Sequence, residues 1–73
     1  MNEDFAKKFA ELETLVKPHM TAEARERYGN LRLAHQELCI KAMVYLAKMI
    51  EAGQMKTVDD KTFKLILLRM QGN

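Results

Sequence analysis

Apolar residues recur along the first part of the chain with the spacing of an α-helix. The recurring positions, at steps of four, three and four, are Phe5, Phe9, Leu12 and Val16. Such steps place the side chains on one face of a helix. Pro18 has no backbone N–H and cannot continue that helix. The pattern therefore predicts a first helix that begins near residue 3 and ends near Val16.

A second helix is predicted from its N-cap. Thr21 offers a side-chain oxygen to the free backbone N–H groups at the start of the run AEARERY, and Glu23 adds a negative charge where the helix dipole favours it. Gly29 and Asn30 tolerate the left-handed geometry that often ends helices. We therefore expect a short helix over residues 22–30, followed by a turn, LRLA, whose two leucines point inward.

The third and fourth helices have the strongest patterns. The run QELCIKAMVYLAKMIEAG is apolar around most of its circumference, with one narrow polar strip, which is typical of a central helix contacted from several sides. Gly53 is its natural C-terminal cap. Further along, Asp59 can cap a fourth helix. The apolar stripe expected on that fourth helix consists of Phe63, Ile66, Leu67 and Met70.

These elements predict an all-α protein with a single domain over residues 1–73. We expect a compact three-helix bundle as the core, over residues 20–70, with an additional N-terminal helix over residues 1–17 that is either docked or mobile. With 73 residues, the chain has room for one hydrophobic core only. No internal repeat or linker divides it.

Composition and cysteine usage indicate an intracellular protein. Apolar residues make up 48% and charged residues 30% of the chain, a globular balance. Cys39 is the single cysteine, so an internal disulfide is impossible and a reducing compartment is favoured. The sequence has no signal-peptide pattern and no long apolar run. We expect a cytoplasmic protein, or one of the nucleoid or nucleus, with no membrane partner.

Nothing in the sequence forms a convincing catalytic or metal site. His35 and Cys39 lie four residues apart, but a zinc site needs further ligands at short spacing, and a buried thiol in an apolar helix is inert. The acid pairs Glu11 with Glu13 and Asp59 with Asp60 do not converge on a helix. The sequence predicts no enzyme, no cofactor and no metal. The internal methionines are expected to fill the core, with an adaptable partner groove as the alternative.

The positive charges are distributed unevenly along this small basic protein, whose net charge is +2. Residues 1–37 carry six Lys/Arg and seven Asp/Glu, whereas residues 38–73 carry six and three. Phosphate contacts in proteins are made mainly by such cations. The candidate nucleic-acid-binding residues are Arg25, Arg27, Arg32, Lys41, Lys48, Lys61, Lys64 and Arg69. For the three arginines, pairing with nearby Glu23 and Glu26 is the alternative.

A family resemblance rests on three stretches of the sequence: TAEARERYGNLRLAHQEL, the apolar helix that ends in AGQM, and VDDKTF. Together they resemble the programmed cell death protein 5 family, whose archaeal members are called double-stranded DNA-binding proteins. The most specific part is ARERYGNLRL, over residues 24–33. The resemblance spans about residues 20–70 and implies a small helical bundle with a mobile N-terminal helix.

The same resemblance implies a function and also shows departures from the family pattern. Members commonly have Lys-Pro where this sequence has His35 and Gln36, and archaeal members end in a Lys/Arg-rich tail that residues 70–73 do not provide. We expect sequence-nonspecific binding of double-stranded DNA through phosphate contacts, weak without a basic tail, by a monomer. The alternative is a protein-interaction adaptor with negligible affinity for DNA, and protein partners stay possible in either case.

Overall fold

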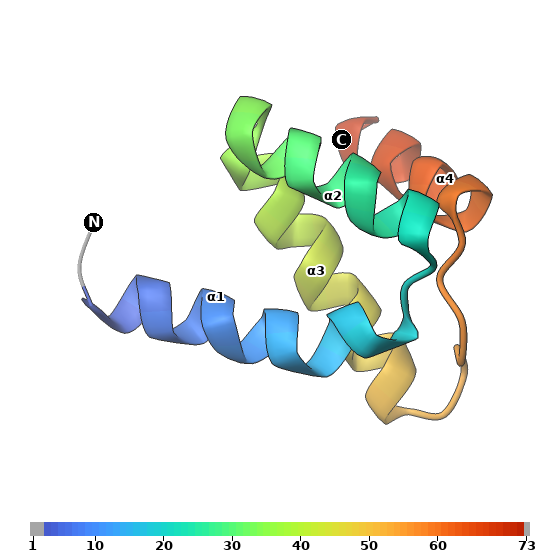
Figure 1. Cartoon of the computed structure of the whole chain (residues 1–73), viewed down its shortest axis with the longest axis horizontal. Helices are drawn as coiled ribbons and strands as arrows, with labels where there is room; N and C mark the ends of the chain where they lie inside the picture. The colour runs from blue at the N-terminus through green and yellow to red at the C-terminus, as the bar shows by residue number, and fades with distance from the viewer. Residues whose placement is uncertain (1–2, 73) are drawn as a thin grey trace.

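The protein is a bundle of four α-helices (Figure 1). A computed structural model describes residues 3–72, with side chains from residue 6 onward, so the predicted contribution of the Phe5 side chain lies outside the described residues. The elements are α1 (Glu3–Val16), a short 3₁₀ turn η1 (Lys17–His19), α2 (Ala22–Ala34), α3 (Gln36–Glu51) and α4 (Asp60–Gln71). No strand occurs within residues 3–72. The all-α prediction is therefore confirmed, as is the end of the first helix at Val16.

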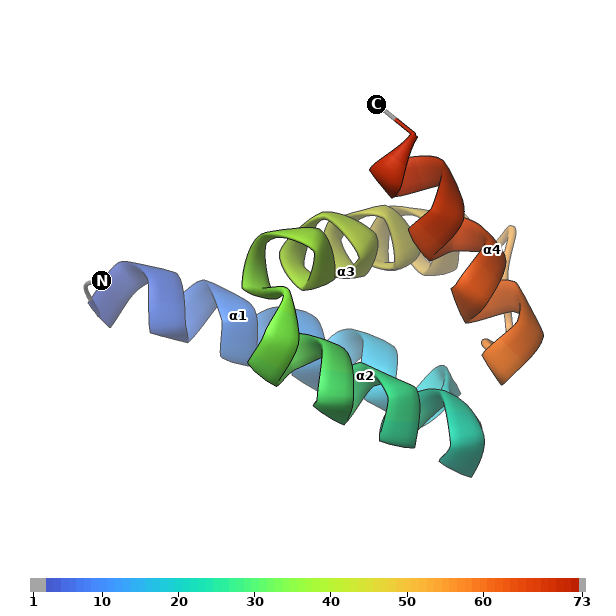
Figure 2. The same cartoon turned by 90° about the horizontal axis from the view of Figure 1, so that it is seen from above.

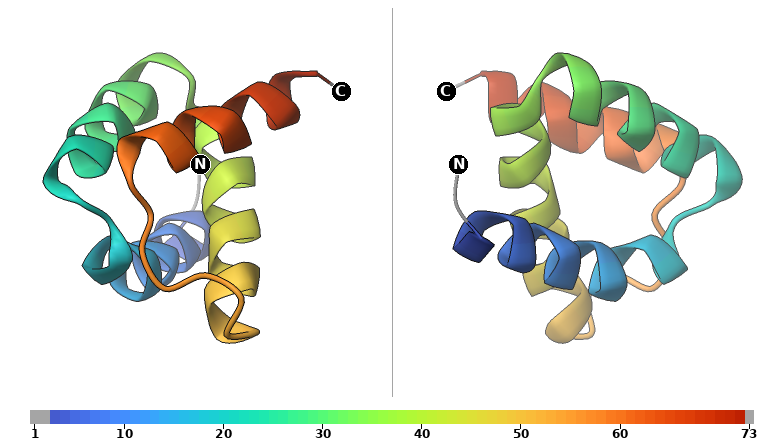
Figure 3. Two further views of the ribbon diagram at one scale, coloured as in Figure 1. Left: turned by 90° about the vertical axis from the view of Figure 1, so that its right-hand side faces the viewer. Right: turned by 60° about the vertical axis from the view of Figure 1, so that its left-hand side comes forward.

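Helix α3 occupies the centre of the fold. It contacts α1, α2 and α4, and α2 also contacts α4. Figures 1 and 3 show α1 crossing α3 toward one end of α3, and α2 and α4 lying together toward its other end. In Figure 2 the first turns of α2 and α4 lie at the same end of the molecule. The apolar circumference of α3 thus has the several neighbours that the sequence pattern indicated.

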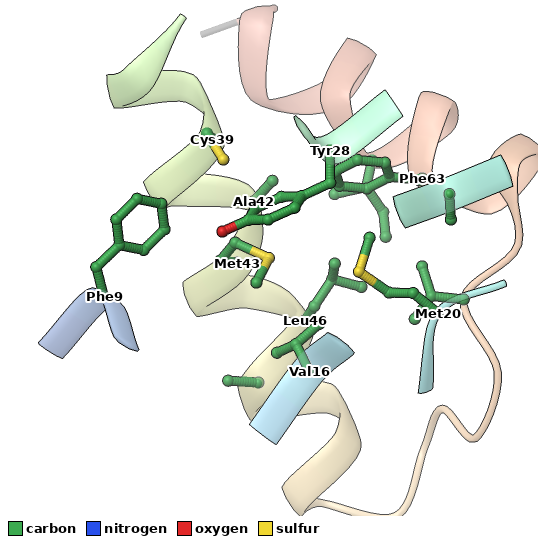
Figure 4. Packing of buried hydrophobic residues seen from close by; sticks show 13 residues of the cluster. Phe9, Val16, Met20, Tyr28, Cys39, Ala42, Met43, Leu46 and Phe63 are labelled. Carbon is green, nitrogen blue, oxygen red and sulfur yellow. The ribbon is translucent and has the colours of Figure 1, made fainter. Parts of the chain in front are cut away.

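The core is formed by side chains from every helix (Figure 4). Tyr28 of α2 and Phe63 of α4 pack with Met43 and Leu46 of α3, and all four are almost fully buried. Among the described side chains, no polar or charged residue other than the tyrosine hydroxyl is buried. Removal of this apolar surface from water is the main term that stabilises the fold.

The helix ends follow the caps predicted from the sequence. The Thr21 side chain accepts a hydrogen bond from the Ala24 N–H at 3.2 Å, and Asp59 accepts one from the Thr62 N–H at 2.7 Å. Gly53 has a φ of +74°. Its N–H donates to the Ile50 carbonyl, and the N–H of Gln54 donates to the Met49 carbonyl. This is the Schellman arrangement, in which glycine takes the left-handed position without a steric penalty.

The segment between α1 and α2 is fixed to the loop that precedes α4. The Thr21 N–H donates to the Val58 carbonyl at 3.0 Å, and the Val58 N–H donates to the His19 carbonyl at 2.8 Å. The His19 ring Nδ1–H donates to the Lys56 carbonyl at 2.8 Å. These contacts hold the first turns of α2 and α4 side by side.

Helix α2 is longer than the sequence predicted. It continues through Gly29 and Asn30 to Ala34, where the His35 N–H donates to the Leu31 carbonyl at 2.7 Å. The predicted turn is wrong, because these residues are helical. Of the two leucines expected to point inward, Leu31 is partly buried and packs against the core, whereas Leu33 is 89% exposed. Packing of Leu31 against the core favours one further helical turn over the local end signal. Gly29 keeps a helical φ, and a glycine there destabilises a helix by roughly 0.5–1 kcal/mol relative to alanine.

Candidate nucleic-acid interface

The eight cations predicted as nucleic-acid contacts are spread over three helices. Seven of them are exposed, and Arg27 is partly buried. Two of the eight, Arg27 and Arg32, form ion pairs within the described part of the chain, and the other six form none there. Unpaired exposed cations are the groups that can replace condensed counterions on a phosphate backbone.

Arg27 is held by a carboxylate from another helix. Its Nε and Nη2 atoms donate to the two carboxylate oxygens of Asp60 at 2.5 and 3.1 Å, which joins α2 to the first turn of α4. The hydrogen bond from Arg27 lowers the pKa of Asp60, and the same bond raises the pKa of Arg27. Bidentate pairing of this kind fixes the guanidinium in orientation. Sequence spacing had suggested Glu23 as the partner, whereas the structure places Arg27 against Asp60.

Arg32 belongs to a cluster that links α2 to α1. Its Nη1 atom donates to Glu13 Oε2 at 3.1 Å, and its guanidinium carbon lies 4.9 Å from the centre of the Phe9 ring. The Tyr28 hydroxyl donates to the same Glu13 oxygen. Figure 4 shows Phe9 of α1 and Tyr28 of α2 approaching each other. Their rings are arranged edge to face, with 6.4 Å between the ring centres. Arg32 thus stabilises the fold and still has half of its side chain exposed.

Arg25 faces a shallow depression that the sequence did not reveal. Its Nε atom donates to the Lys17 carbonyl at 3.1 Å, and the Lys17 ammonium lies 5.5 Å from the centre of the Tyr28 ring. We call the depression the basic depression. It has a volume of about 600 Å³ and is lined by Lys17, Arg25, Tyr28, Gly29, Arg32, Leu33 and Gln36. Lys17 was missed because only the tertiary fold brings η1 beside α2.

A second depression lies on the other flank of α2, against α4. Its volume is about 450 Å³, and its charged and ionisable lining residues are Glu23, Glu26, Arg27, His35 and Asp60. We call it the acidic depression, because three carboxylates line it and its one arginine is already paired. The two flanks of a single helix therefore carry opposite charge.

The remaining predicted cations project from α3 and α4. Lys41, Lys48, Lys61, Lys64 and Arg69 are all exposed. Lys41 lines a depression with Met70 and Gln71 at the end of α4. Lys64 lies one helical turn after Asp60, and its charge helps to lower the pKa of that carboxyl group. These five cations are thus distributed over two helices.

The residues considered for other chemistry do not come together. Cys39 is fully buried, and burial raises the pKa of its thiol to about 11, whereas His35 is exposed. Residues 3–72 contain no group of three or more His, Cys, Asp or Glu side chains that could hold a metal ion. In the same part of the chain no helix has the length and hydrophobicity needed to cross a bilayer.

The fold and the surface together define a small helical protein with accessible cations on three of its helices. Comparison with known proteins gives the particular family. The chain belongs to the double-stranded DNA-binding domain family, whose model matches residues 2–73. The resemblance to the programmed cell death protein 5 family and its archaeal members is thereby confirmed.

Individual relatives are archaeal. The chain is 37% identical over 59 residues to a DNA-binding protein of Thermococcus kodakarensis. The matched stretch covers 80% of this chain and 53% of the relative. It is 33% identical over 67 residues to a DNA-binding protein of Methanococcoides burtonii, covering 90% and 59%. The chain thus spans little more than half the length of the relatives it matches. No solved structure matches the chain.

Proposed function

We propose that this protein binds double-stranded DNA without sequence preference, through contacts between its exposed cations and the phosphate backbone. The observation that carries the proposal is that six of the eight predicted cations are exposed and form no ion pair within residues 3–72, on a member of the double-stranded DNA-binding domain family. Contacts to phosphates carry no direct sequence information. Among the side chains that the structure describes, none forms an aromatic platform for stacking single strands, because Phe9, Tyr28 and Phe63 are buried and Tyr45 is partly buried.

The expected affinity is low. The contacting residues are drawn from Arg25, Arg27, Arg32, Lys41, Lys48, Lys61, Lys64 and Arg69. Because these lie on different flanks of the bundle, one duplex can meet only some of them at a time. About three simultaneous phosphate contacts give a log–log salt slope of roughly −2.7, so affinity falls about 40-fold between 50 and 200 mM salt.

The test is fluorescence anisotropy of a labelled duplex titrated with the protein at those two salt concentrations. Two duplexes of unrelated sequence should bind equally, and a single strand of the same length should bind no more tightly. Arg25→Gln should make the salt slope less steep, since this side chain is exposed and its removal leaves the core intact. Absence of binding at 50 mM salt would contradict the proposal.

A protein-interaction adaptor is the second candidate, and two observations favour it. A groove of about 590 Å³ between α1 and α3 is lined by apolar Phe9, Leu12, Ile40 and Val44, with Lys7, Lys8 and Glu11 at its edges. On α4, Leu65 and Leu68 are 55% and 62% exposed. If duplex DNA fails to bind at low salt, the groove and the exposed leucines of α4 are the features to examine next.

A further inference from the structure

Gly29 occupies a position where the structure gives glycine no local role. It lies within α2, is exposed and has a helical φ, so no left-handed geometry requires it. A β-carbon built at Gly29 would have no atom within 4 Å, so close packing does not require it either. Glycine weakens a helix interior relative to alanine. Close approach of a ligand to the backbone is a use of glycine that fits these observations.

The neighbours of Gly29 identify the kind of ligand. Arg25 and Arg32 lie four residues before and three residues after it, so both border the same strip of the helix surface. Together with Lys17 they line the basic depression, and no carboxylate lines it. Glu13 holds Arg32 from the α1 side but is not among the lining residues. An anion is the ligand that such a lining favours.

The spacing of the two arginines indicates an extended anion. Seven residues of α-helix span about 10.5 Å, so Arg25 and Arg32 would contact different phosphates rather than share one. Arg25 uses its Nε atom on the Lys17 carbonyl, and this bond aims the rest of the guanidinium without neutralising its charge. A phosphodiester backbone running along α2 satisfies both arginines.

We propose that the basic depression is the binding site for the DNA backbone, and that the DNA approaches the protein most closely at Gly29. This inference rests on the proposed function and narrows it to one flank of α2. The acidic depression on the other flank repels phosphate, because Glu23, Glu26 and Asp60 line it and Arg27 is paired. Lys17 joins the contact residues, and Arg27 has a structural role.

The experiment compares two substitutions that add the same side chain to the same helix. Gly29→Gln fills the basic depression, whereas Ala34→Gln adds the matched bulk in the acidic depression. Both positions are exposed, and glutamine is a neutral, good helix former. Circular dichroism should show both variants folded, with Gly29→Gln raising the Tm by several degrees.

Anisotropy with duplex DNA at 50 mM salt then separates the outcomes. We expect Gly29→Gln to raise the Kd on the order of tenfold, about the worth of one phosphate contact, and to flatten the salt slope. Ala34→Gln should change the Kd by less than about twofold. If the native protein binds duplex DNA and Gly29→Gln binds it equally well, the proposed binding site is wrong while the proposed function stands. If the native protein itself does not bind, both are wrong.

Discussion

Tyr28→Phe tests the contact that ties α1 to α2, because it removes one hydroxyl and leaves the ring. The phenyl ring would keep its edge-to-face contact with Phe9 and its position beneath the Lys17 ammonium. Glu13 Oε2 would still accept the hydrogen bond from Arg32 Nη1 at 3.1 Å. Burial and the hydrogen bond to Glu13 raise the pKa of Tyr28, so at pH 7 the hydroxyl is protonated and donates. The variant therefore isolates the hydrogen bond between Tyr28 and Glu13.

The expected loss of stability in Tyr28→Phe depends on the surroundings of Glu13. A hydrogen bond to a charged group contributes about 1.5–3 kcal/mol. The Glu13 side chain is 19% exposed and still has Arg32, so water and the guanidinium compensate in part. We expect the free energy of unfolding to fall by about 1–2 kcal/mol. In a domain of this size each kcal/mol shifts the Tm by about 4–8 °C.

Urea unfolding followed by circular dichroism at pH 7 measures the effect. Tyr45→Phe is the matched control, because Tyr45 is only partly buried and its hydroxyl makes no hydrogen bond within residues 3–72. Its cost should stay within about 0.5 kcal/mol. In a double-mutant cycle with Glu13→Ala, the two substitutions should couple by roughly 1 kcal/mol. Equal losses in Tyr28→Phe and Tyr45→Phe, or strict additivity with Glu13→Ala, would refute the reasoning.

Two further predictions concern a backbone position and a thiol. Gly53→Ala should lower the free energy of unfolding by about 1–2 kcal/mol in urea titrations, because Gly53 has a left-handed φ; an unchanged or raised stability would contradict this. Burial raises the pKa of Cys39 to about 11 from an ordinary 9.0, so the folded state holds a proton that the unfolded state releases. Stability should therefore decline as pH rises from about 9 toward 11, and Cys39→Ala should flatten that decline; parallel pH profiles for the two proteins would refute it.

The parts of the fold that depend only on residues close together in the sequence were predictable from the sequence. The caps at Thr21 and Asp59 and the glycine at position 53 act within a few residues, so their sequence signals correspond directly to hydrogen bonds in the structure. The end of α2 was not predictable in this way. Gly29 and Asn30 permit a helix to end but do not require it, and the packing of Leu31 decides the outcome.

The ion pairs of the candidate interface were beyond sequence spacing for a related reason. Within a helix, spacing identifies partners only three or four residues apart. Arg27 pairs with Asp60 33 residues away, and Arg32 pairs with Glu13 19 residues away. The lining of the basic depression by Lys17 also depends on how η1 meets α2. The cations could be named from the sequence, whereas their division into paired and free groups required the fold.

That division explains why net charge is a poor guide to this protein's binding surface. The charged residues of α2 alternate in sign from Glu23 to Arg27. The helix nevertheless places Arg25 and Arg32 on one flank, and Glu23, Glu26 and the paired Arg27 toward the other. An α-helix with its side chains is about 10–12 Å across, and the Debye length at 0.1 M salt is about 10 Å. A phosphate on the basic flank is therefore largely screened from the carboxylates opposite. A net charge of +2 averages over both flanks, whereas a bound duplex would meet only one.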